Sequence, residues 1–310
     1  MASVAEDGLK RSQVAGLQRS RMLAATFEAC AQQGAAGLSV ADIVGRAGIS
    51  RRTFYELFDS CEACLLAALD QAIAVAGERA LAAHDPQAPW RARMRSALTA
   101  LLQFLDEQPQ MARLLVVESL AAGPRAFERR TRALAGVVAA IDEGRQATRR
   151  GAEPPPLAAE GIAGGILAVL HQRMLESARR PLTELSNPLM GMIVLPYLGA
   201  GAARAELEQP TPKPPPRRPP GPESLATLDM RLTYRTIRVL QAIAEQPGVS
   251  NRQVGRVAGV DDPGQISKLL GRLQRIGLIE NTATPIKGAA NSWALTSKGT
   301  EIQRTIAAQL

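Results

Sequence analysis

The chain has 310 residues and a formal net charge of +8, with 46% hydrophobic and only 3% aromatic residues. This length predicts two or three domains with buried cores, and an apolar fraction rich in alanine and leucine favours packed helices over sheets. Three cysteines, an odd number, together with the lack of an apolar stretch of membrane-spanning length or a signal-peptide core, exclude a typical secreted or membrane protein. We therefore expect a cytoplasmic protein without membrane contact. The positive charge suits a polyanionic partner, although an arginine-rich composition also accompanies a GC-rich genome.

Residues 39–66 have the pattern of a helix, a tight turn and a second short helix that leads into a third. Ser39 is a predicted N-cap, and Asp42 stands three residues later as its capping-box partner. Gly48 follows the last residue of the apolar periodicity, where a left-handed residue ends many helices. Ser50 is then the predicted N-cap of the second helix.

The predicted second helix has a basic and polar first turn, while Phe54 and Phe58 give it an apolar far side. A short helix with this division suits the major groove of DNA. Arginine pairs with two acceptors on guanine, whereas serine and tyrosine hydroxyls reach phosphates and set the register. A solvated basic turn is the alternative interpretation. The predicted DNA-contacting residues are Ser39, Ser50, Arg51, Arg52, Thr53 and Tyr55.

These residues resemble the N-terminal DNA-binding domain of TetR/AcrR-type transcriptional regulators over about residues 17–70. The features that match are Gly34 at the end of a long first helix, Ser39-Val40 with Ile43, Ala47-Gly48-Ile49-Ser50, then Thr53, Tyr55, Phe58 and the acidic Asp59-Ser60-x-Glu62. The sequence departs from the family pattern at Cys61, where the family usually has a lysine that meets a DNA phosphate. The resemblance implies a homodimer that binds a palindromic operator in double-stranded DNA, usually as a ligand-responsive repressor.

Residues 1–16 are polar and are expected to form a flexible arm, and residues 17–66 the helix-turn-helix domain. Residues 67–208 are helical throughout by pattern. Within them Leu157–Arg179 and Pro188–Ala203 are apolar on most sides, so they need a partner surface. The resemblance implies that these last two helices form a dimeric four-helix bundle.

The same resemblance implies that the middle domain binds a small-molecule effector. Candidate contacts follow from residue type alone, and ordinary core packing is the alternative at each position. They are Phe104, Met111, Glu118, His171 and Met174.

Residues 209–222, QPTPKPPPRRPPGP, form a proline-rich linker that favours an extended, semi-rigid spacer. Residues 223–310 then read as a separate domain in the order helix, helix-turn-helix, hairpin, helix. In it Ser250 caps one short helix, and Asp262 caps the next with Pro263 at its first position. This domain carries 11 Lys and Arg against 7 Asp and Glu, a net charge of +4 (11 − 7).

The stretch from Ile237 to Thr300 resembles MarR-like winged-helix regulators, notably in LLGRLQRIGLIE before the predicted wing and ALTSKG after it. The resemblance implies a second DNA-binding head, tethered by the linker. A protein-interaction module is the alternative, because such domains also dock proteins. The predicted contacts on this head are Gln265, Ser267, Lys268, Arg272 and, in the wing, Lys287.

Cys61 and Cys64 stand three residues apart at a predicted helix start, which favours a reactive thiol in principle. A buried structural cysteine and a surface substitution are the preferred interpretation. No further Cys or His cluster completes a metal site, and no catalytic set or phosphate-binding glycine loop is present in the sequence. The sequence therefore predicts an all-α regulator with a small β-hairpin in its C-terminal domain, no cofactor and no enzymatic activity.

Overall fold

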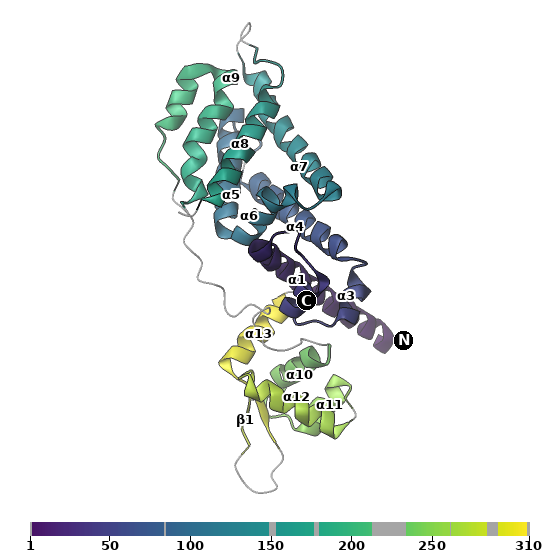
Figure 1. Cartoon of the computed structure of the whole chain (residues 1–310). Coiled ribbons are helices and arrows are strands. Elements are labelled where there is room, and N and C mark those ends of the chain that lie inside the picture. The colour runs from purple at the N-terminus through teal and green to yellow at the C-terminus, as the bar shows by residue number, and fades with distance from the viewer. Residues whose placement is uncertain are drawn as a thin grey trace. The chain divides into compact units, whose positions relative to one another are not determined.

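The computed structural model describes residues 2–83, 85–148, 153–176, 180–212, 234–260, 262–283 and 291–308. Over these residues the chain is mostly helical (Figure 1) and contains one two-stranded antiparallel sheet. The chain divides into two compact units. The first contains Met1–Ala25, Ser39–Ser60 and Pro220–Leu310, and the second contains Thr26–Leu38 and Cys61–Pro219.

Helix α1 runs over Ala2–Gln33, so residues 2–16 are helical where the sequence predicted a flexible arm. The segment contains no proline, and Gly8 and Gly16 are its only strong helix breakers, so helix propensity carries the element further than the apolar pattern indicated. The division into two units falls within α1, after Ala25.

The predicted caps of the first helix-turn-helix are confirmed. Helix α2 spans Val40–Ala47 and has a complete capping box between Ser39 and Asp42. It ends at Gly48, whose φ of 62° is left-handed and favours glycine. Helix α3 spans Arg51–Leu57, and the side chain of its N-cap Ser50 accepts a hydrogen bond from the Thr53 N–H at 3.0 Å.

The second unit consists of helices packed around one apolar core. Its elements after α1 are α4 (Cys61–Ala82), α5 (Trp90–Glu107), α6 (Pro109–Val116), η1 (Glu118–Leu120), α7 (Pro124–Asp142), η2 (Glu143–Ala147), α8 (Ala158–Leu175), η3 (Leu182–Leu185) and α9 (Ser186–Leu207). The largest fully buried side chains of this core include Leu102, Phe104, Ile141, Leu170 and Met190. These residues come from several different helices, which explains why the middle of the sequence reads as helical and amphipathic.

Helix α9 is broken at Gly199, which has φ 81° and ψ 177°. A β-carbon placed on Gly191 would lie 3.6 Å from both the Ala203 carbonyl oxygen and the Leu207 side chain. The residues after the break therefore fold back along those before it. The predicted continuous helix over Pro188–Ala203 is wrong at this point, because a glycine with positive φ interrupts the helix three residues after Pro196.

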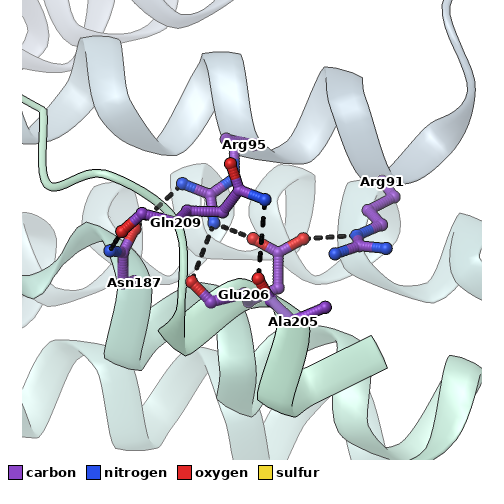
Figure 2. Close-up of polar contacts among 6 residues, drawn as sticks. All are labelled: Arg91, Arg95, Asn187, Ala205, Glu206 and Gln209. Carbon is purple, nitrogen blue, oxygen red and sulfur yellow. Dashed lines mark hydrogen bonds and ion pairs between the residues drawn. The ribbon is translucent and has the colours of Figure 1, made fainter. Parts of the chain in front are cut away.

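A buried ion cluster fixes the returning half of α9 to α5 (Figure 2). The Glu206 side chain is 1% exposed, and its carboxylate accepts hydrogen bonds from both Arg91 and Arg95. Arg95 also donates to the Asn187 side chain at 3.0 Å, and Asn187 donates to the Gln209 carbonyl at 2.6 Å. The start and the end of α9 are thus held together.

The described residues from Tyr234 to Ala308 follow the predicted order of elements. They are α10 (Tyr234–Glu245), α11 (Asn251–Ala258), α12 (Pro263–Arg275), β1 (Ile279–Asn281), β2 (Trp293–Leu295) and α13 (Ser297–Ala308). The strands pair antiparallel, with Ile279 opposite Leu295. The core of this domain contains Leu240, Ile243, Leu270, Leu273 and Trp293.

Three sequence predictions remain: the proline-rich linker, the wing residue Lys287 and the lack of a membrane-spanning helix. The linker is described only over 209–212, and Lys287 lies outside the described residues. Among the helices that are described, no single one is long and apolar enough to cross a membrane, while α3 and α4 together pass that test by length and composition as a pair bent by 61°.

Candidate nucleic-acid interface

Helix α3 is anchored on one side and free on the other. Phe54 and Phe58 are buried, and their ring centroids lie 5.8 Å apart. Arg51 and Arg52 are exposed, and Tyr55 is 57% exposed with its ring edge-on to Phe54. The apolar side therefore fixes the helix, and the basic first turn and the tyrosine project into solvent. This arrangement is the one required for a helix that enters a DNA groove.

The Arg52 guanidinium already has an anionic neighbour. Its Nε donates to a Glu56 carboxylate oxygen at 3.0 Å, and the two side chains are 90% and 56% exposed. An exposed pair of this kind contributes at most about 1 kcal/mol. Arg52 can therefore exchange Glu56 for a phosphate or a base edge at little cost.

The predicted serine and threonine contacts also have structural roles in the helix caps. The Ser39 hydroxyl and the Ser39 N–H both donate to the Asp42 carboxylate in the capping box. The Ser50 and Thr53 hydroxyls lie 2.9 Å apart at the start of α3. These three residues cap the starts of α2 and α3. Their hydroxyls can therefore contact a phosphate only while they also keep their hydrogen bonds within the caps.

Arg19 is a feature of this region that the sequence did not reveal. Its guanidinium lies over the Phe58 ring, 5.3 Å from the centroid, in cation–π geometry. The contact joins α1 to the end of α3. No local pattern could indicate it, because helical spacing within α1 says nothing of which ring a side chain meets in another helix.

Helix α12 carries the second group of predicted contacts at exposed positions. Ile266, Leu270 and Leu273 are buried beneath it. Gln265 accepts a hydrogen bond from Arg235 of α10 at 3.4 Å, which places the Arg235 guanidinium beside the start of α12. The predicted contacts that are exposed on α12 are Gln265, Ser267, Lys268 and Arg272.

Asn251 connects α12 to the base of the hairpin, and the sequence did not single it out. Its side-chain amide donates to the Ser267 hydroxyl at 3.2 Å. Its carbonyl oxygen accepts from the Trp293 indole at 2.7 Å and from Asn291 at 3.2 Å. One side chain thus joins α11, α12 and β2, and fixes the hairpin relative to the exposed side of α12.

The five effector candidates differ in burial and in the groups they contact. Phe104 is buried, and Met111 and Met174 pack against the same core. His171 is half-buried on α8. Glu118 is buried, and both of its carboxylate oxygens are engaged by groups of the protein itself, Arg113 and the Ala35 N–H. The three apolar candidates share this core.

The three cysteines, none of which is in a disulfide, lie near the end of α1 and the start of α4. Cys64 is buried, with its sulfur 3.3 Å from the Thr26 hydroxyl, and Cys61 is half-buried. Burial raises the pKa of Cys30 to about 12, and Glu118, Cys61 and Cys64 add to the effect. A raised pKa opposes thiolate formation at neutral pH. Among the described residues no group of His, Cys, Asp and Glu could hold a metal ion.

Comparison with known proteins assigns the first helix-turn-helix, which we call the first head, to a protein family. Residues 22–68 match the family described as bacterial regulatory proteins, tetR family. These residues therefore form a helix-turn-helix domain of the TetR family, a DNA-binding domain of transcription regulators. Among curated proteins no sequence matches this chain.

Solved structures extend the likeness beyond the first head. The fatty acid degradation regulator FadR from Bacillus halodurans is 16% identical with a TM-score of 0.51, over 57% of this chain and 94% of that one. At this identity the likeness shows a shared fold. FadR from Bacillus subtilis in complex with stearoyl-CoA is 18% identical with a TM-score of 0.48, over 58% and 98%. A TetR family regulator from Marinobacter aquaeolei VT8 is 24% identical with a TM-score of 0.45, over 57% and 93%.

Proposed function

We propose that this protein is a homodimeric, ligand-responsive transcription regulator that reads a palindromic operator through two copies of α3. The observation that carries the proposal is the exposed Arg51, Arg52 and Tyr55 surface on a helix fixed by Phe54 and Phe58, within a TetR-family domain. Paired identical heads read two half-sites of opposite orientation, so operator symmetry follows from a two-fold dimer.

The exposed sides of α8 and α9 support the dimer. Val169 and Leu175 on α8 are exposed, as are Met192 and Leu195 on α9. The two helices lie side by side here, because a β-carbon on Gly165 would be 3.3 Å from the Met192 methyl group. An exposed apolar surface of this kind is stabilised by burial against a second copy of the chain.

We place the effector in the middle domain, against the apolar candidates Phe104, Met111 and Met174. Their common core predicts an apolar small molecule, because apolar side chains offer area and few hydrogen bonds. Trp90 belongs to the same core, so a bound molecule is expected to change its fluorescence.

We further propose that residues 223–310 form a winged helix-turn-helix that contacts DNA as a second head. The support is the turn between α11 and α12, whose caps repeat those of the first head. The capping box of Ser250 and Gln253 matches that of Ser39 and Asp42, and Gly259 has a left-handed φ of 65°. No acidic residue interrupts the sequence of α12 after Asp262, which favours DNA over a basic protein partner.

The test uses duplexes that the full chain selects from a random DNA library. Arg51→Ala with Arg52→Ala is expected to weaken binding at least tenfold and to lower the slope of log affinity against log salt by about 1 for each phosphate interaction that the change removes. Lys268→Ala with Arg272→Ala is expected to reduce the slope similarly. Arg132→Ala, an exposed arginine on α7, is the control.

The outcomes separate the alternatives. If the Lys268 and Arg272 variant binds like the intact chain, the second domain is a protein-interaction module and only the first head reads DNA. If the Arg51 and Arg52 variant also binds like the Arg132→Ala control, the proposal is wrong as a whole.

A further inference from the structure

The carboxylate of Glu118 makes a long-range contact with the chain just beyond α1. Glu118 lies in η1 and is 7% exposed. One carboxylate oxygen accepts from the Ala35 N–H at 3.0 Å, across 83 residues of sequence. The other accepts from the Arg113 Nε of α6, also at 3.0 Å. The group thus joins α6 and η1 to the segment that follows the first helix.

The segment that Glu118 holds leads directly into the first head. Gly34 has φ 81°, and a β-carbon on it would lie 3.3 Å from the Glu118 carboxylate. The sequence continues through Leu38, whose carbonyl accepts from the Cys61 thiol at 3.5 Å, to Ser39, the N-cap of α2. Residues 34–38 are therefore held at both ends by side chains from outside the helix-turn-helix.

A carboxylate suits this position for two reasons. A hydrogen bond with an ionised acceptor is roughly twice as strong as a neutral one. The second oxygen binds Arg113, so the carboxylate cannot rotate freely away from Ala35. The two contacts therefore hold Ala35 at a fixed distance from α6 and η1.

We propose that Glu118 is a positioning residue that sets the path of residues 34–38, and with it the position of the N-cap Ser39 at the start of α2. This inference rests on the proposed function, because the start of α2 matters for binding only if the helix-turn-helix reads DNA. It also assigns a role to Glu118 other than effector contact.

The test compares Glu118→Ala and Glu118→Gln in the full chain, with Glu128→Ala as the matched control. Glu128 is an exposed acid on α7 that pairs with Arg132. Binding is measured to a duplex selected by the intact chain and to a scrambled duplex of equal length. Glu118→Ala is expected to weaken binding to the selected duplex about tenfold, the size of one charged hydrogen bond, and to leave scrambled binding unchanged.

This difference separates positioning from folding. A loss of folded protein weakens both duplexes alike, whereas a misoriented head keeps its phosphate contacts and forfeits its base contacts. Glu118→Gln keeps an oxygen acceptor for the Ala35 N–H and is expected to retain more affinity than Glu118→Ala. Equal affinity of Glu118→Ala and Glu128→Ala for the selected duplex overturns the inference, as does a parallel loss on both duplexes.

Hydrogen exchange gives a second measurement that needs no DNA. Glu118→Ala is expected to speed amide exchange over residues 34–47, which include α2, relative to Glu128→Ala. If the intact chain selects no duplex, the proposed function fails and exchange alone decides the inference: unchanged exchange over 34–47 contradicts it, and faster exchange supports it.

Discussion

The two helix-turn-helix segments of this chain share one turn and differ in the helix that follows it. α2 and α11 each have eight residues, begin with a capping box and end at a left-handed glycine. After each glycine the next N–H bonds back into the helix, from Ile49 to Val44 at 3.1 Å and from Val260 to Gly255 at 2.9 Å. The turn is therefore fixed by short-range chemistry that two different sequences reproduce.

The second helices place their charges differently. α3 has seven residues, and its N-cap Ser50 is followed at once by two arginines. α12 has thirteen residues, begins at the acidic N-cap Asp262, and carries its first cation at Lys268. The first head thus offers its charge at the helix start, and the second along the helix body. A shared turn fixes how the second helix is presented, and leaves open which part of that helix carries the charge.

The heads also differ in how the second unit holds the chain that leads to them. Glu118 holds the segment before α2, whereas the cluster of Glu206, Arg91 and Arg95 holds the residues after which the chain leaves toward the C-terminal domain (Figure 2). Each attachment is a buried carboxylate with arginine. Three changes break or sharpen this comparison.

The largest effect is expected for Glu206→Ala. The change leaves two partly buried guanidiniums facing each other without their anion, and burial already lowers the pKa of Arg95. The free energy of unfolding of the second unit should fall by about 2–3 kcal/mol. Hydrogen exchange resolved by peptide should show faster exchange in α5 and α9, with α10–α13 unchanged because their core is separate.

Glu208→Ala is the control, since Glu208 is an exposed acid two residues further on. Equal acceleration of exchange in α10–α13 would show that the stability of the second head depends on the cluster, and that the two attachments are not independent.

The same contrast explains what the sequence could predict. Caps at Ser39, Gly48 and Asp262 follow from neighbours within four residues, so the pattern located them correctly. The exposure of Arg51 and Arg52 followed from the spacing of two buried phenylalanines. Local patterns of this kind determine where helices begin and end, and which side they bury.

Contacts between distant residues were not predictable in the same way. Arg91 and Glu206 are 115 residues apart, and the break at Gly199 that brings Glu206 back to α5 left no clear mark in an apolar helix. Glu118 was classed by type as an effector contact, because no pattern links an acid in η1 to an amide 83 residues earlier. Tertiary packing decides these roles, and a single sequence does not state it.

Smaller changes in the free energy of unfolding, of opposite sign, are expected for alanine substitutions at Gly45 in α2 and Gly255 in α11. A β-carbon on Gly45 meets nothing within 4 Å, so Gly45→Ala should stabilise by up to about 1 kcal/mol through helix propensity. A β-carbon on Gly255 would lie 3.0 Å from the Val260 carbonyl, so Gly255→Ala should destabilise by about 1 kcal/mol through displacement of the turn. Urea unfolding followed by circular dichroism measures both.

Peptide-resolved exchange assigns each change to its own head. If both alanines stabilise, the second turn tolerates the added carbon by relaxing, and the two turns are less alike than their caps indicate.

The smallest effect is expected from exchanging the N-caps of the second helices. Serine and aspartate cap almost equally well, so Ser50→Asp and Asp262→Ser should leave the free energy of unfolding nearly unchanged. Their charges act on DNA instead. Ser50→Asp places a carboxylate beside Arg51 and should weaken binding to a selected duplex by about threefold, whereas Asp262→Ser should strengthen it by about twofold at low salt.

Asp85→Ser provides the matched control, because Asp85 is an exposed acid that caps only a local turn, accepting from the Gln87 N–H at 2.9 Å. Affinity measured at two salt concentrations distinguishes charge from shape, since a charge effect shrinks as salt rises. If Asp262→Ser matches Asp85→Ser at both concentrations, the start of α12 does not approach phosphates. Any DNA contact of the second head would then depend on Lys268 and the cations after it, which lie along the body of α12 and not at its start.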